Sequence, residues 1–304
     1  MVTKQILRTW CTSLSRHTPN VRGKSRLVLA LNRLLLPSPE SACIVTADMK
    51  LGYRMLVDLR SGTEALAAYT GDYDNEEVAS CLRLLEADSV VLDVGANVGF
   101  WTVPLALRLA GRGQVLAFEP LPENSCRLRD NVALNDVGRA VSIHAIGLSD
   151  RPDTTEISLR EDFAMGSATG NAAIVIDESD RQFRCATIQV DTLDRVFDSL
   201  QIPRLDFIKL DIEGHEDKFL AGAVKVLSRF RPILFVEVNA QYYERRGLAV
   251  DAVFQSWLDS NRYVCALRTR QGWDLDELRR RRHRIDNVFF LPEERASDLL
   301  RVIG

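Results

Sequence analysis

Leu92-Asp93-Val94-Gly95-Ala96-Asn97-Val98-Gly99-Phe100-Trp101 is the most informative run in this sequence. It extends the apolar residues Val90 and Val91 and leads into an apolar, helix-compatible segment, residues 100–110. An apolar strand, a glycine turn and a helix in this order are typical of an α/β protein that binds a ligand at the carboxyl end of a strand. Because the strand ends in Asp93, we expect the ligand to carry positive charge there.

The glycine spacing separates two classes of nucleotide-like cofactor. A dinucleotide fingerprint counted from Gly95 needs glycines at positions 97 and 100, but Asn97 and Phe100 stand there. Asparagine adopts a left-handed backbone more readily than most residues, so the turn still forms. S-adenosylmethionine has a cationic amino group and sulfonium, whereas Asp93 would repel a pyrophosphate. The turn therefore predicts an S-adenosylmethionine site contacted by Asp93, Gly95, Asn97, Gly99 and Phe100.

A second strand-end acid supports this cofactor. Val115-Leu116-Ala117-Phe118-Glu119-Pro120 is an apolar run that ends in Glu119. In this topology a carboxylate at that place accepts hydrogen bonds from the ribose hydroxyls, and Pro120 lines the mouth of the adenosine pocket. The alternative is a solvated glutamate before a turn-starting proline.

The remaining pattern predicts the fold class. Apolar strands alternate with helical segments from residue 89 to 147, and alternation resumes with Phe207–Ile212 and Ile233–Val238. This order favours a doubly wound, mostly parallel sheet. Residues 151–190 interrupt the alternation with two β-prone runs, which we interpret as an inserted β-hairpin that covers a ligand site or forms a plain surface excursion.

The most charged strand end is Lys209-Leu210-Asp211-Ile212-Glu213-Gly214-His215-Glu216. Strand alternation places Lys209, Asp211 and Glu213 on one face. Asp211 could deprotonate a hydroxyl directly or hold a divalent cation, with Lys209 positioning the substrate oxygen. His215 is within reach as a base or a substrate contact. An ion-pair network that only fixes the strand end is the alternative.

A further acid, Glu237, ends the strand expected beside Asp211. Together Asp211 and Glu237 would supply oxygen ligands for Mg²⁺, so they are the candidate metal ligands. The four histidines show no spacing typical of a zinc site. The run Arg279–Arg284 is either a solvated basic face or a clamp for an acidic substrate.

The charge distribution divides the chain. Residues 1–39 contain seven basic residues and no acidic one, whereas the remainder holds all 42 acidic residues. An acidic main body argues against nucleic-acid binding. We expect a basic helical extension at residues 1–45 and a catalytic domain at residues 46–304. Residues 1–36 are interpreted as a helix packed on the domain edge, a peripheral membrane contact or a mitochondrial transit peptide. Scattered cysteines without a CxxC pair favour a reducing cytoplasm.

These motifs resemble the FkbM-type S-adenosylmethionine-dependent methyltransferases. The resemblance rests on Val91–Gly99, Phe118-Glu119-Pro120, Ile208–Glu216 and the upstream segment Tyr69–Tyr73, and it covers roughly residues 50–291. It implies a Rossmann-like seven-stranded sheet with an antiparallel last strand and O-methylation of a sugar, glycolipid or polyketide hydroxyl. His215 falls on a free position of the family motif. The alternative function is a cofactor-binding protein without turnover that acts as a partner subunit.

Overall fold

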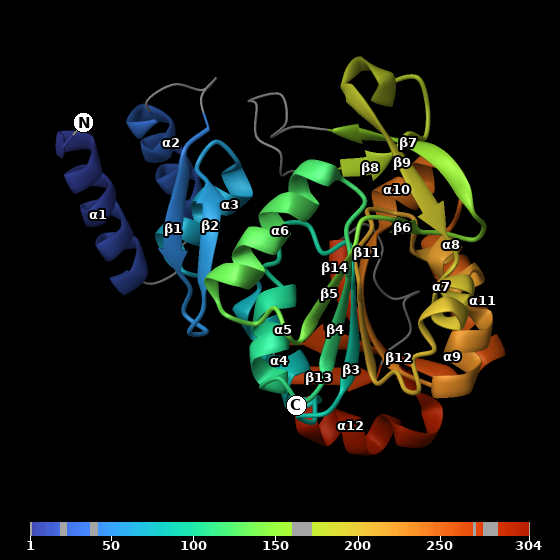
Figure 1. Cartoon of the computed structure of the whole chain (residues 1–304). Coiled ribbons are helices and arrows are strands. Elements are labelled where there is room, and N and C mark those ends of the chain that lie inside the picture. Colours follow the sequence, from blue (N-terminus) through green and yellow to red (C-terminus); the bar gives the residue numbers. More distant parts are fainter. Residues whose placement is uncertain are drawn as a thin grey trace.

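The computed structural model describes residues 2–18, 23–36, 42–159, 172–269, 272–275 and 285–303. A central sheet has helices on both faces (Figure 1). Within the described residues its strand order is β13-β12-β14-β11-β10-β3-β4-β5. The strand bounds are β3 Val90–Val94, β4 Gln114–Phe118, β5 Val141–His144, β10 Phe207–Leu210, β11 Ile233–Asn239, β12 Tyr263–Thr269, β13 Gly272–Leu275 and β14 Ile285–Pro292.

Strand direction confirms the predicted Rossmann-like fold. Strands β5, β4, β3, β10 and β11 run parallel, and β14 is antiparallel to both β11 and β12. The sheet has eight strands rather than the expected seven, because the chain folds back after β12 into the short strand β13. Only Trp273 of that strand is buried, so it gave no apolar run to indicate a strand.

Alternation along the strands explains the two helical layers. Leu92 and Val94 of β3 pack into one core, and Val91 packs into the core on the opposite face. The first core is covered by α7 (Leu193–Leu200), α8 (Glu216–Ala221), α9 (Val224–Phe230), α10 (Ala240–Arg245) and α11 (Val250–Asn261). The second is covered by α4 (Asn75–Arg83), α5 (Thr102–Leu109), α6 (Pro122–Leu134) and α12 (Ala296–Ile303), which follows the short helix η4 (Glu293–Arg295).

The segment expected as an inserted hairpin lies in a second sheet of four strands, in the order β6-β9-β7-β8. Their bounds are β6 Gly147–Leu148, β7 Asp153–Leu159, β8 Ala172–Ile174 and β9 Arg184–Asp191, with the short helix η2 at Asp180–Gln182. Strands β7 and β9 pair antiparallel from Asp153 to Leu159. Gly166 and Gly170 lie outside the described residues.

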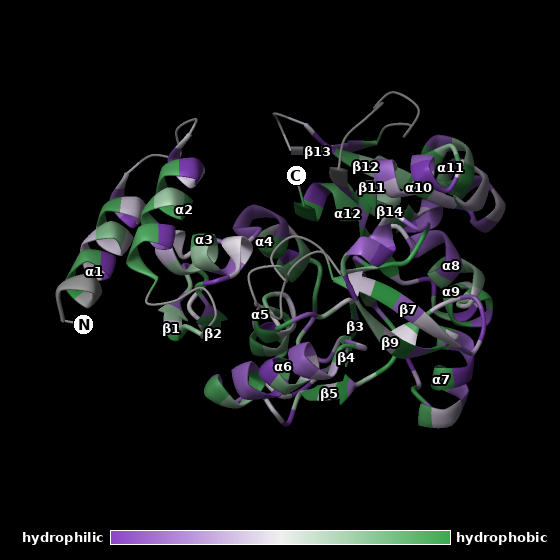
Figure 2. Ribbon diagram, turned by 90° about the horizontal axis from the view of Figure 1, so that it is seen from above, coloured by the Kyte–Doolittle hydropathy of each residue, from purple (hydrophilic) through white to green (hydrophobic). Residues whose placement is uncertain are grey.

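The N-terminal part forms a separate small layer (Figures 1 and 2). It contains α1 (Val2–His17), α2 (Lys24–Leu35), the antiparallel hairpin of β1 (Ile44–Asp48) and β2 (Arg54–Asp58), and α3 (Gly62–Thr70). The domain boundary that we predicted after residue 45 falls within strand β1. That boundary remains a proposal. No helix in the described part of the chain has the length and apolar content needed to span a bilayer.

Directional polar contacts join this N-terminal unit, residues 2–18, 23–36 and 42–70, to helix α6. The Asn131 amide accepts from Leu56 N–H at 2.6 Å and donates to the Val98 carbonyl at 2.8 Å. Arg127 makes a bidentate ion pair with Glu64, whose side chain is 1% exposed. Glu64 also accepts from Asp58 N–H at 2.8 Å. This buried carboxylate therefore fixes α3 and β2 against α6.

We predict that Arg127→Ala lowers the free energy of unfolding by about 3–5 kcal/mol, because it leaves the buried Glu64 charge without its partner. Urea denaturation followed by circular dichroism measures the change. Lys50→Ala is the control, because the Lys50–Asp72 pair has side chains 48% and 47% exposed and such pairs contribute about 0–1 kcal/mol. Equal effects of the two substitutions would contradict the structural role of Arg127.

Candidate active site

The turn after β3 has the left-handed backbone that its sequence predicts. The φ angles are +79° at Gly95, +50° at Asn97 and +102° at Gly99. A Cβ atom on Gly95 would lie 1.9 Å from the backbone oxygen of Asp211. No other residue fits there, because real Cβ atoms never come so close to backbone. Gly95 thus lets the turn touch the loop that follows β10.

Two of the predicted cofactor residues lie beneath the turn rather than on the surface of the cleft beside it. Asp93 is fully buried, and its Oδ2 accepts from the Thr102 hydroxyl at 2.5 Å. Its Oδ1 has no hydrogen-bond partner among the described residues. A Cβ on Gly99 would lie 2.7 Å from Leu128, so this glycine lets α5 pack closely on α6. Neither Asp93 nor Gly99 is among the residues that line the cleft, so their contact with a cofactor remains a prediction.

The cleft itself is lined by most of the predicted residues. They come from the carboxyl ends of β3, β4 and β10, and they are Gly95, Asn97, Phe100, Glu119, Pro120, Lys209, Asp211, Glu213 and His215. The buried side-chain oxygens of Asn97 and Asn124, which also line the cleft, have no partner among the described residues. Such polar atoms suit a ligand that carries hydrogen-bond donors.

Glu119 is held in a fixed orientation at the end of β4. It is 5% exposed, and its two oxygens accept from Asn97 N–H at 2.9 Å and Leu121 N–H at 3.0 Å. Burial raises the pKa of Glu119 to about 7, although these backbone donors partly oppose the shift. Each carboxylate oxygen can accept a further hydrogen bond, so the group can bind a ribose diol.

The segment that we interpreted as an insert covering a ligand site or a surface excursion supplies an apolar wall of the cleft, although the sequence did not identify its lining residues. Ile157, Ile174, Ile188 and Val190 of the four-stranded sheet line the cleft together with Tyr73. The Tyr73 ring stacks on Phe100 with centroids 4.1 Å apart. Alternating apolar residues in β7 and β9 could have indicated one apolar face, but not which surface that face covers.

The loop after β10 differs from the expected strand. The strand ends at Leu210 rather than Ile212, and Glu213 has a left-handed φ of +55°. Asp211 and Glu213 therefore lie beyond the end of the strand. The prediction that strand alternation places them on one face with Lys209 is wrong. Lys209 and Asp211 still form an ion pair, with Nζ and Oδ2 3.0 Å apart. Burial opposes the charge of Lys209, but the carboxylates of Asp211 and Asp93 outweigh it and raise its pKa.

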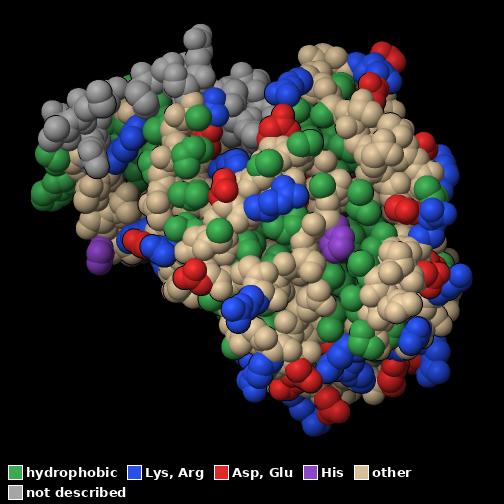
Figure 3. Space-filling model, viewed as in Figure 1, with side chains coloured by type: hydrophobic (Ala, Val, Ile, Leu, Met, Phe, Trp, Pro, Cys, Tyr) green, Lys and Arg blue, Asp and Glu red, His purple; other side chains and the backbone are tan. Residues whose placement is uncertain are grey.

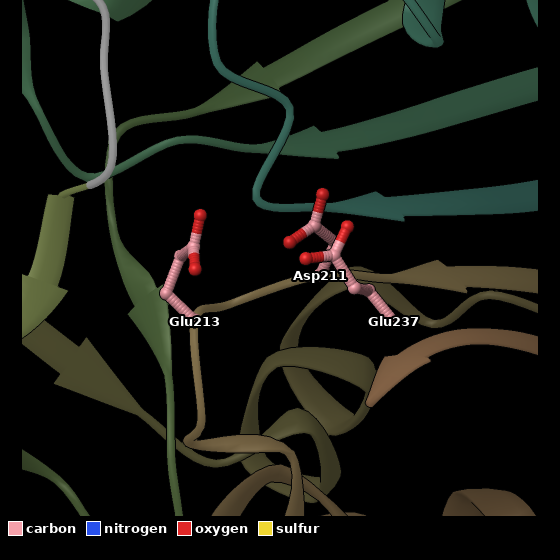
Figure 4. A group of neighbouring side chains, drawn as sticks. All are labelled: Asp211, Glu213 and Glu237. Atoms are coloured by element: carbon pink, nitrogen blue, oxygen red, sulfur yellow. The ribbon is translucent and has the colours of Figure 1, made fainter. Parts of the chain in front are cut away.

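Three carboxylates converge beside this ion pair. Asp211, Glu213 and Glu237 each offer an oxygen within 4.8 Å of the others, and Figure 4 shows the Asp211 and Glu237 carboxylates next to each other. The negative charge of Asp211 together with burial raises the pKa of Glu237. Burial and then Asp211 raise the pKa of Glu213. A hydroxyl or a hard cation placed among these oxygens would relieve their repulsion.

His215 and Glu216 are neighbours in the sequence, but they make different contacts. His215 Nε2 lies 3.2 Å from the Ser149 hydroxyl, and burial lowers the pKa of the imidazole to about 4. The ring is therefore neutral at pH 7 but a weak base. Glu216 accepts from Ile212 N–H at 3.1 Å and Gly214 N–H at 3.2 Å. Its role is to hold the loop rather than only to interact with a helix dipole.

A second cavity of about 430 Å³ adjoins the carboxylates. Tyr73 lines both this cavity and the cofactor cleft, and Asp74 and Glu237 lie at the same end. The far wall belongs to the N-terminal unit and includes Lys24, Ser25 and Lys50. The run Arg279–Arg284, also considered for substrate binding, lies outside the described residues.

The FkbM methyltransferase domain matches residues 93–265 of this chain. Among curated relatives, the hexuronic acid methyltransferase AglP of Haloferax volcanii is 26% identical over 174 residues, which cover 55% of this chain and 63% of AglP. The methyltransferase sdnD of Sordaria araneosa is 27% identical over 165 residues, covering 45% of this chain and 61% of sdnD. The AMB antimetabolite synthetase AmbE of Pseudomonas aeruginosa is 30% identical over 171 residues, covering 46% of this chain and 8% of AmbE. This chain thus spans less than two thirds of each of these relatives.

Solved structures also match parts of this chain. A methyltransferase FkbM from Methylobacillus flagellatus KT is 20% identical, with a TM-score of 0.42 over 68% of this chain and 44% of that one. The O-methyltransferase from Bacillus cereus in complex with SAH is 13% identical, with a TM-score of 0.42 over 72% of this chain and 80% of that one. Because the matched domain covers more than half of its length, the chain belongs to the FkbM family of S-adenosylmethionine-dependent methyltransferases.

Proposed function

We propose that this protein transfers the methyl group of S-adenosylmethionine to a hydroxyl of a sugar, glycolipid or polyketide-type small molecule. The observation that carries the proposal is the position of Asp211. Its carboxylate lines the cofactor cleft, pairs with Lys209, and lies within 4.8 Å of Glu237, which lines the second cavity. An acidic group between a cofactor cleft and a second cavity suits proton removal from an acceptor that enters from the second side.

The cofactor end of the proposal uses the turn and β4. Glu119 would accept the ribose hydroxyl hydrogens, and the backbone of Gly95, which lines the cleft, would contact the cofactor. The buried oxygens of Asn97 and Asn124 fit its amino and adenine donors. Tyr73, stacked on Phe100, would separate the cofactor from the acceptor except at the methyl group.

The transfer balances without a redox partner. The acceptor oxygen forms a bond to the methyl carbon while the bond from that carbon to sulfur breaks, and the electron pair stays on sulfur. The hydroxyl proton goes to Asp211. Lys209 contacts Asp211 Oδ2, so we assign proton acceptance to Oδ1. The sulfonium is already activated, so positioning of the hydroxyl in line with sulfur supplies most of the catalysis.

The chemistry of the second cavity supports a polar acceptor. Hydroxyl side chains of Thr18, Ser25, Thr63 and Thr70 line it together with both signs of charge. Lys24 donates to the Ser15 and Thr18 carbonyls and Lys50 pairs with Asp72, so the cavity is polar rather than positively charged. The hexuronic acid named for the relative AglP is one polar acceptor to test. Labelled methyl transfer to sugar acids, glycolipids and polyketides, with the product located by mass spectrometry, tests this acceptor class. Cofactor binding without transfer to any of them would favour the partner-subunit alternative.

A divalent cation is a further part of the proposal. Asp211, Glu213 and Glu237 present the hard oxygen ligands that Mg²⁺ prefers. When bound there, the ion would lower the pKa of an acceptor hydroxyl. Lys209 neutralises only part of the charge of the three carboxylates, so a divalent cation would balance the remainder.

We predict that Asp211→Ala lowers kcat by about 10²–10⁴-fold, the usual contribution of a positioned base. Binding of S-adenosylhomocysteine changes little, because Glu119 and the turn remain intact. Rates come from labelled methyl transfer, and affinity comes from calorimetry. Asp298→Ala is the matched control, because Asp298 lies on α12 with its side chain 86% exposed. A wild-type rate in the Asp211 variant would exclude this residue as the base.

We predict that S-adenosylhomocysteine binds more tightly as pH rises from about 6 to about 8, by up to roughly tenfold per unit below the pKa of Glu119. The cause is that burial raises this pKa to about 7, whereas the ribose hydroxyls donate to the ionised form. Calorimetry at both pH values measures the change. The Glu119→Gln variant should bind S-adenosylhomocysteine weakly at both pH values. Asp93→Asn is the control: if it keeps the pH dependence, Glu119 rather than Asp93 is the titrating group.

We predict that dialysis against EDTA lowers methyl transfer at least about tenfold and that Mg²⁺ restores it, if the carboxylates act through a metal. Binding of S-adenosylhomocysteine should survive this treatment, because Glu119 and Asn97 lie outside the carboxylate cluster. Full activity after EDTA would remove the metal from the proposal and leave Asp211 as the base.

A further inference from the structure

Helix α1 turns its apolar side away from the protein. Ile6, Leu7, Trp10 and Leu14 are 51%, 48%, 72% and 67% exposed. At 3.6 residues per turn these positions fall within an arc of about 100° on one side of the helix. Ser15, on the opposite side, is 6% exposed. A surface helix usually packs its apolar side against the protein core, whereas α1 exposes it.

Helix α2 continues this pattern. Leu27 and Leu34 are 62% and 74% exposed, and residues seven apart lie on the same side of a helix. The exposed side chains of Arg26 and Arg33 flank them. Figure 2 shows α1 and α2 at one edge of the molecule, and Figure 3 shows hydrophobic side chains gathered at that edge. We call these six exposed apolar residues, Ile6, Leu7, Trp10, Leu14, Leu27 and Leu34, the N-terminal apolar face.

The segment that carries this face is basic. Residues 1–39 hold seven Lys and Arg residues and no acid. A cavity of about 650 Å³ between α1, β1 and α3 is lined by Arg8 and Arg16. The buried Nε–H group of each arginine has no partner among the described residues, although Arg16 Nη2 donates to the Asp48 carbonyl at 2.6 Å. Arg8 Nη2 likewise donates to the Leu35 carbonyl at 2.8 Å, so these two arginines hold α1 on the protein, and the exposed Arg26 and Arg33 are the cations that can attract anionic headgroups.

We propose that the N-terminal apolar face docks on an anionic lipid surface, with α1 and α2 lying in the plane of the interface. Apolar side chains enter the acyl boundary, Trp10 lies at the headgroup level where its ring and N–H are both satisfied, and the basic residues attract anionic headgroups. A second copy of the chain is the poorer partner, because it would bring two strongly basic segments together. The proposal does not depend on the methyl acceptor.

The docking places the second cavity near the lipid. Lys24 and Ser25, at the start of α2, belong both to this unit and to the cavity wall. An acceptor carried by a lipid would therefore reach the carboxylate cluster from the membrane side.

The test is vesicle flotation of the full chain. We expect the protein to float with phosphatidylcholine vesicles that contain phosphatidylglycerol, at least about tenfold more than with phosphatidylcholine alone, and to detach in high salt. The double variant Trp10→Ser, Leu14→Ser should float at least about tenfold less, because it loses the interfacial anchor. Its thermal unfolding and its affinity for S-adenosylhomocysteine should match the wild type, since both side chains are exposed.

Two further variants complete the design. Val224→Ser changes another exposed apolar residue, 58% exposed on α9, and should float as the wild type does. Arg26→Glu with Arg33→Glu should abolish the preference for the anionic vesicles. Absence of flotation, equal flotation with neutral vesicles, or undiminished flotation of the Trp10 and Leu14 variant would overturn the proposal. So would a dimer in light scattering that this variant abolishes, since the face would then be a self-association surface.

Discussion

The buried carboxyl group of Glu216 determines the shape of the candidate catalytic loop. It accepts from two backbone N–H groups of the loop after β10 and from the Tyr243 hydroxyl at 2.5 Å. Burial raises the pKa of Glu216 to about 7, and the hydrogen bonds from the Tyr243 hydroxyl and Ile212 N–H oppose that shift. Without this acceptor, the N–H groups of Ile212 and Gly214 would be buried unpaired, at a cost of about 1–3 kcal/mol each. The loop therefore has one stable path.

That path explains the residue types around it. Gly214 has φ of +86° and a Cβ there would lie 2.1 Å from the Tyr242 side chain, so only glycine fits. The path also brings the Asp211 carbonyl against Gly95, across more than a hundred residues of sequence. The glycine turn and the acidic loop consequently fix each other, and a displacement of either would move Asp211, the proposed base, relative to the proposed cofactor cleft. This mutual contact makes two short motifs into one site.

Much of the cofactor site could be predicted from the sequence, because strand-end residues of parallel strands meet at one edge of a sheet. Glu119 and Asp211 were located by that rule alone. Asp93 was located correctly at the end of β3, but its burial was not, because the sequence does not reveal that Thr102 shields it. The Glu216 contacts were missed because a carboxylate at a helix start suits the dipole as well as a loop anchor. An insert over the ligand site was one of our alternatives, but Tyr73 and the residues of the apolar wall were not identified, because tertiary contacts over long separations place them.

Residues 1–45 were expected to form an extension, but the larger N-terminal unit packs against the candidate site. Its core includes Val98, Phe100 and Val103, which belong to the cofactor turn and α5. Its junction with α6, by contrast, uses the directional hydrogen bonds of Asn131 and the buried Glu64. Apolar contacts tolerate small sliding movements, whereas hydrogen bonds of this kind do not. The wall of the second cavity is thus held at a defined distance from Glu237, which the proposed positioning of an acceptor hydroxyl requires.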